Sequence, residues 1–213
     1  MSAQQKPDNG IAESEAGERG EPEKPGKPID PRLDPEAMLL SSLLAVEAGP
    51  DGEGLAVADA GYVLDYLHPK EFSQPSYGRI FTLMKEQMAD GKLITPAAIS
   101  ARIEATADTD GWGGTTPQLR LLSLYELGGL PAQITYYADE VLSASYRRQY
   151  QAMVTSLQQA SQQAGEADLF PLLVEHGTAQ RRAWRRRTRF LASAPSTSTP
   201  ETDTEDYEEK PAS

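Results

Sequence analysis

The chain has 213 residues, enough for one folded domain with terminal extensions, and it contains no cysteine. The absence of cysteine excludes disulfides, thiolate metal sites and a cysteine nucleophile, and it suits the reducing cytoplasm, where we expect the protein to act. The net charge of -12 argues against a surface that binds DNA over its whole extent. No stretch approaches the roughly 18 consecutive apolar residues of a membrane-spanning helix, and the N-terminal residues lack the apolar core of a signal peptide.

Both ends of the chain have the composition of disordered tails. Residues 1–33 and 192–213 are rich in proline and in small or charged residues, with almost no large apolar side chains. Such segments cannot bury enough surface to offset the entropy lost on ordering. We therefore expect a disordered tail at each end, the second one acidic.

The segment after the first tail carries the signals of short helices. The first is predicted to begin at Asp34-Pro35, because a capping carboxylate precedes a proline that suits the first helical position. A second helix is predicted over about 57–67. Ser73 is the predicted N-cap of a third helix, which Asp90-Gly91 ends.

The third helix has one apolar face. Its members recur at helical spacing and are Tyr77, Ile80, Phe81, Met84 and Met88. This pattern predicts a short helix that is buried along one side.

Two further helices are predicted to begin where a threonine precedes a proline, at Thr95-Pro96 and Thr116-Pro117. The second of these is the richest in leucine, so we expect it to be the central helix. No alternating β pattern appears anywhere in the chain. The predicted fold class is therefore all-α, with a small helical head of about five to six helices over residues 34–137.

Residues 138–191 are predicted to form a long helical hairpin. Gly165 separates two segments, each with apolar residues at helical spacing. Asp168 is the predicted cap of the second helix. Each apolar stripe is wider than one partner helix can cover, so we expect the hairpin to associate with another copy. The residues predicted to carry self-association are Tyr146, Tyr150, Met153, Leu157, Leu169, Leu173 and Trp184.

The pair Glu71-Phe72 precedes the run from Tyr77 to Phe81 in the third predicted helix. In their order and spacing, this run and the segments around it resemble the N-terminal domain of the DnaB-type replicative DNA helicase family, in which an acidic residue and a phenylalanine precede a similar helix. The run from Pro131 to Val141 is similar to a further family segment, and the arginine that follows that segment corresponds to Arg147 or Arg148. The resemblance covers about residues 34–190.

The resemblance implies a helical head followed by a hairpin, with hairpins associating into a collar of dimers. It implies a role in DNA replication, and it implies a replicative helicase, a primase or a helicase loader as partners. The motor of such helicases needs a G-x-x-x-x-G-K-[ST] loop to hold phosphates, and this sequence has none. We expect no ATPase activity, and no catalytic, cofactor-binding or metal-binding residues; His68 and His176 are expected to be structural.

An arginine cluster just before the acidic tail leaves two interpretations open. Its members are Arg181, Arg182, Arg185, Arg186, Arg187 and Arg189. In the first, they only complement the dipole at the end of a helix, with Trp184 packed inside the hairpin. Alternatively they contact a phosphate backbone or an acidic protein, which would make this a nucleic-acid-binding accessory or regulatory protein. The acidic tail either only aids solubility or folds back and screens these arginines.

Overall fold

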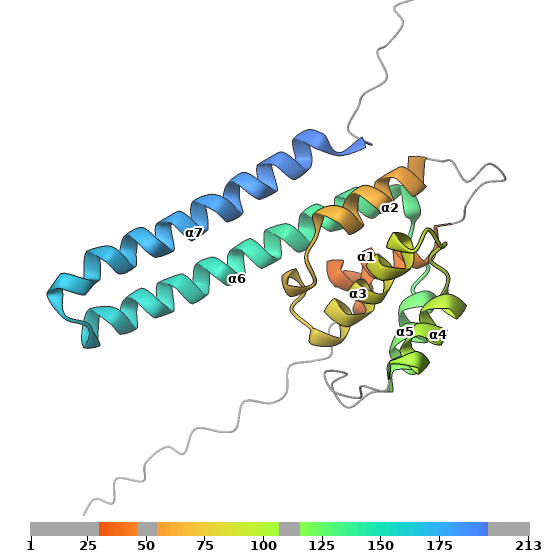
Figure 1. Ribbon diagram of the computed structural model, residues 1–213, viewed down its shortest axis with the longest axis horizontal. Coiled ribbons are helices and arrows are strands. Elements are labelled where there is room, and N and C mark those ends of the chain that lie inside the picture. The colour runs from red at the N-terminus through yellow and green to blue at the C-terminus, as the bar shows by residue number, and fades with distance from the viewer. Residues whose placement is uncertain (1–29, 47–54, 107–115, 196–213) are drawn as a thin grey trace, which may run out of the picture.

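A computed structural model of the chain describes residues 30–46, 55–106 and 116–195. Within these ranges the secondary structure is helical and contains no strand, which confirms the predicted all-α class. Figure 1 shows a head of short helices beside two long antiparallel helices. Of the two predicted tails, residues 1–29 and 196–213 lie outside the described part of the chain.

The head holds, in chain order, η1 (Pro31–Leu33), α1 (Pro35–Leu44), α2 (Leu55–Tyr66), η2 (Pro69–Glu71), α3 (Pro75–Ala89), α4 (Pro96–Ala105), α5 (Pro117–Glu126) and η3 (Pro131–Gln133). The hairpin consists of α6 (Ile134–Gln163) and α7 (Glu166–Ser193). The fold begins slightly before the predicted boundary at residue 34, because the Asp30 side chain accepts a hydrogen bond from the Arg32 N–H and caps η1.

The predicted cap-and-proline starts are correct for α1, α4 and α5, although Thr116 makes no side-chain cap bond. Asp34 accepts a hydrogen bond from the Glu36 N–H at 3.0 Å, and Thr95 accepts one from the Ala98 N–H at 3.2 Å. The prediction that Ser73 caps α3 is wrong: Gln74 holds that position without a side-chain cap bond.

Asp168 likewise does not cap the second hairpin helix. Gly165 occupies the cap position, and Asp168 lies inside the first turn of α7, where its charge complements the helix dipole. The helix therefore starts directly after the turn glycine.

The core of the head is built around α1. Eight of its ten residues are buried, and it packs against α3, α5 and α6. Ile80, Phe81 and Met84 of the α3 stripe are fully buried against it, as their spacing predicted.

The prediction that α5 is central is wrong. Leu121 and Leu124 are buried, but Leu119, Leu122 and Tyr125 are exposed at 59%, 50% and 53% of their surface. The reason is that α5 carries leucines on more than one face, while its main packing partners, α1 and α4, cover one side.

The C-terminal end of α7 is attached to the head. Phe190 is fully buried, and its ring centroid lies 5.3 Å from that of Tyr62 and 5.2 Å from that of Tyr66, both on α2. The two phenols donate to backbone carbonyls of α7, Tyr62 to Phe190 at 2.9 Å and Tyr66 to Arg186 at 2.6 Å. Burial raises the pKa of both phenols, so they remain donors at neutral pH. The opposite end of the hairpin, with its turn, projects away from the head (Figure 1).

We predict that Phe190→Ala destabilises the protein by about 3 kcal/mol, since a buried aromatic ring is lost and a cavity remains. Urea unfolding followed by circular dichroism measures the change. Leu191→Ala is the matched control, because Leu191 is the next residue and is 42% exposed. Equal effects of the two substitutions would contradict the attachment.

Candidate interaction surface

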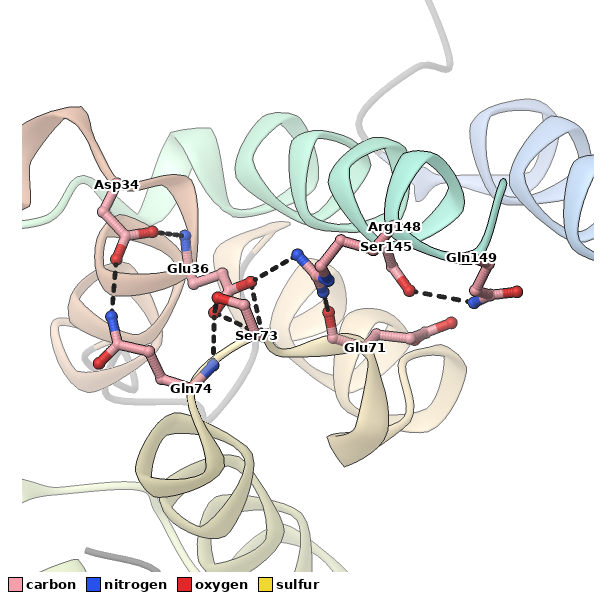
Figure 2. Close-up of polar contacts among 8 residues, drawn as sticks. All are labelled: Asp34, Glu36, Glu71, Ser73, Gln74, Ser145, Arg148 and Gln149. Atoms are coloured by element: carbon pink, nitrogen blue, oxygen red, sulfur yellow. Dashed lines mark hydrogen bonds and ion pairs between the residues drawn. The ribbon is translucent and has the colours of Figure 1, made fainter. Parts of the chain in front are cut away.

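A buried carboxylate joins the head to the hairpin. The side chain of Glu36, on α1, is almost fully buried. It accepts hydrogen bonds from the Ser73 N–H at 2.8 and 2.9 Å and from the Ser73 hydroxyl at 2.9 Å. Arg148 of α6 forms an ion pair with it at 3.2 Å (Figure 2). A buried charge is tolerated when it is paired and hydrogen-bonded in this way.

A second buried carboxylate, Glu71, receives an arginine from the other hairpin helix. It accepts a hydrogen bond from the His68 N–H at 2.7 Å and forms an ion pair with Arg186 of α7. The Glu71 carbonyl also accepts a hydrogen bond from Arg148, so both hairpin helices hold the end of η2. Of the two arginines matched to the family motif, Arg148 is the one that makes these contacts.

A third ion pair ties the two hairpin helices together. Arg187 of α7 donates two hydrogen bonds to Asp139 of α6, each 3.0 Å long. The hydrogen bond to Asp139 raises the pKa of Arg187, against the effect of its partial burial. Two of the six clustered arginines, Arg186 and Arg187, are therefore used inside the fold.

The other arginines of the cluster face outward. Arg182, Arg185 and Arg189 join Arg186 and Tyr66 in lining a groove of about 300 Å³ between α7 and α2, which we call the arginine groove. Their spacing of three and four residues places them on one side of α7. Arg181 is exposed and does not line this groove.

The hairpin also carries exposed apolar side chains, which we call the hairpin apolar surface. Its members are Tyr150, Val154, Leu169, Phe170, Leu173, Val174 and Trp184, with exposed fractions between 36% and 72%. Leu169 and Leu173 lie one turn apart on α7, as do Phe170 and Val174, and contiguous exposed apolar side chains mark interaction sites on soluble proteins.

Four of the seven predicted self-association residues belong to this surface: Tyr150, Leu169, Leu173 and Trp184. The other three, Tyr146, Met153 and Leu157, are half-buried, and Tyr146 lines a cavity between the hairpin and η2. Sequence reasoning missed Val154, Phe170 and Val174. Each directly follows a residue that was predicted to carry self-association. Only the orientation of the helices in the folded protein shows that these three side chains are exposed.

The two histidines have structural contacts. His68 is the N-cap of η2, and its Nδ1 accepts a hydrogen bond from the Lys70 N–H at 3.4 Å. His176 lies 3.2 Å from the Ser156 hydroxyl across the hairpin. In the part of the chain that the structure describes, no cluster of His, Asp and Glu could hold a metal ion. No helix there is long and apolar enough to cross a bilayer.

Comparison with protein families supports the resemblance seen in the sequence. The family model for the DnaB-like helicase N-terminal domain matches residues 30–143, which is more than half of the chain. The chain belongs to the DnaB-like helicase N-terminal domain family. The match ends within α6, so the arginines of the arginine groove and every member of the hairpin apolar surface lie beyond it.

A solved structure of this family has the same fold. It is the crystal structure of the N-terminal domain of DnaB helicase from Mycobacterium tuberculosis, with a TM-score of 0.50 and 19% sequence identity. The alignment covers 73% of this chain and 94% of that one. A search of curated protein sequences gives no match. The DnaB-like domain is thus identified by its family model and its fold.

We predict that Glu36→Gln destabilises this DnaB-like domain by about 2 kcal/mol. The neutral amide leaves Arg148 without its charged partner, and the amide N–H group lies close to the donors of Ser73. Thermal and urea unfolding measure the loss. The control is Glu104→Gln, which makes the same change at an exposed position of α4. A loss no larger than that of the control would show that the buried ion pair contributes nothing.

Proposed function

We propose that this chain is a collar module of the DnaB-like N-terminal type, which self-associates through its hairpin and binds replisome proteins. The observation that carries the proposal is the hairpin apolar surface, most of which lies away from the attached end of α7 that holds Trp184. The family and the fold support a role in DNA replication.

The geometry favours pairing of one hairpin with another. Leu169 and Phe170 lie near the turn of the hairpin, Leu173 and Val174 lie one helical turn further along α7, and Tyr150 and Val154 lie on α6. Burial of such side chains contributes about 25 cal/mol for each Å² of apolar surface removed from water. Two hairpins related by a two-fold axis would cover the same surface on both copies and form a four-helix bundle.

The proposal assigns the module no motor of its own. The 213 residues contain no phosphate-binding loop of the helicase type, so the purified chain should not hydrolyse ATP. The partners that the family implies are a replicative helicase, a primase and a helicase loader in the cytoplasm. A complex that forms with one of them on co-purification would identify the partner.

We predict that Leu173→Asp converts the oligomer into a monomer, because it places a charge in the centre of the proposed interface, where desolvation is costly. Light scattering coupled to size exclusion measures the mass, and circular dichroism checks that the helix content is retained.

Leu119→Asp provides the matched control for this test. Leu119 is 59% exposed on α5 of the head and Leu173 is 52% exposed on α7, so the same charge is added at similar exposure outside the hairpin. If both variants keep the parent mass, or if the parent itself is monomeric, self-association through the hairpin is rejected.

The arginine groove supports a second candidate function, contact with nucleic acid. Arg182, Arg185 and Arg189 form no ion pair within the described residues, and guanidinium groups beside an aromatic ring suit phosphates and stacked bases.

For this candidate we predict that the double variant Arg185→Gln, Arg189→Gln binds single-stranded DNA more weakly than the parent. The slope of the logarithm of the binding constant against the logarithm of the salt concentration should also fall in magnitude by about 1.4, the value for two lost phosphate contacts. Fluorescence anisotropy at several salt concentrations measures the slope. Absence of DNA binding at about 0.05 M salt, where such contacts are strong, would eliminate this function.

A further inference from the structure

The arginine groove is a cationic site whose charge is not balanced by the fold. Arg186 is neutralised by Glu71, but Arg182, Arg185 and Arg189 have no ion-pair partner among the described residues. Burial raises the pKa of the Tyr66 phenol, and the nearby charges of Arg186 and Arg189 oppose that rise. The groove therefore presents three cations around one aromatic ring.

The chain itself contains a segment with the complementary charge. Soon after α7 ends, the sequence carries six acidic residues and one lysine within ten positions. The acidic residues are Glu201, Asp203, Glu205, Asp206, Glu208 and Glu209, and Tyr207 lies among them. We propose that this acidic segment, residues 201–209, binds in the arginine groove of the same molecule.

The distances along the chain allow this contact. Arg185 lies ten residues before Pro195, which corresponds to about 15 Å along a helix at 1.5 Å per residue. The six residues from Pro195 to Glu201 span up to about 20 Å when extended. The acidic residues can therefore reach Arg182, Arg185 and Arg189 without any change in the fold.

Tethering favours this occupant over a free polyanion. A segment attached by a short linker has an effective concentration on the order of millimolar, so even weak charge pairs are populated. A separate nucleic acid must instead approach a protein with a net charge of -12, and that approach is disfavoured by repulsion. Tyr207 adds an aromatic face on which an arginine plane can stack.

The site is separate from the proposed self-association surface. Trp184 lies two residues from Arg182 on α7, and residues two apart point to different sides of a helix. The inference therefore does not rest on the proposed collar function, and it can hold in a monomer or an oligomer.

Energy transfer within the full chain tests the contact directly. The chain has no cysteine, so Ala212→Cys provides one site for an acceptor dye near the acidic segment. It has two tryptophans, so Trp112→Phe leaves Trp184 of α7 as the only tryptophan donor. We expect high transfer at about 0.02 M salt, falling by at least about two-fold at about 0.5 M, because salt screens exposed charges.

Two matched variants identify the partners. Changing the six acidic residues to their amides should lower the transfer and remove its salt dependence. Arg182→Gln with Arg185→Gln should also lower it, whereas Arg32→Gln with Lys92→Gln, which removes the same charge from exposed positions elsewhere, should leave it unchanged. Equal transfer in the parent and in the six-amide variant would overturn the proposal.

Two other results would also overturn it. A loss of transfer on mixing with excess unlabelled parent chain would show that the segment binds a second copy instead. If a single-stranded oligonucleotide binds the parent and the six-amide variant with equal affinity, the groove is open to nucleic acid and the acidic segment does not occupy it. Under the proposal, the six-amide variant binds the oligonucleotide more tightly than the parent does, or neither binds it.

Discussion

The two buried carboxylates of Glu36 and Glu71 determine where the hairpin lies. Each is enclosed by the head and each receives an arginine from a different hairpin helix, Arg148 from α6 and Arg186 from α7. A buried carboxylate is stable only while its partners are in place, so these contacts select one position of the hairpin on the head. Phe190, packed against α2, holds the end of α7 in the same position.

This attachment divides the hairpin into two parts with different roles. The part near the head uses its side chains internally, since the ion pair of Arg187 with Asp139 joins the helices there. Among the described residues, the far part has only the other hairpin helix beside it, and its apolar residues are exposed. A fixed base with an uncovered end suits a module that presents the same rigid surface to every partner, because little conformational entropy is lost on binding.

The arginine cluster illustrates how one sequence feature separates into several roles. Neighbouring arginines on a helix point in different directions, so Arg186 and Arg187 reach carboxylates of the fold, while Arg182, Arg185 and Arg189 line the groove without an ion pair among the described residues. Arg186 and Arg187 stabilise the fold by pairing with carboxylates that lie 115 and 48 positions earlier in the chain. Neither interpretation drawn from the sequence anticipated these internal ion pairs, and Trp184, expected inside the hairpin, is 56% exposed. Contact of the groove arginines with an acidic ligand stays a proposal.

Local sequence signals determined the all-α class, the proline starts of α1 and α4, the buried stripe of α3 and the long hairpin. Each of these depends on residues within a few turns of one another. The tertiary structure alone decided that α1 rather than α5 is central, that Ser73 bonds to Glu36 instead of capping a helix, and which apolar residues of the hairpin are exposed. Periodicity defines the faces of a single helix, but which face is covered depends on the rotation and position of helices far away in the sequence.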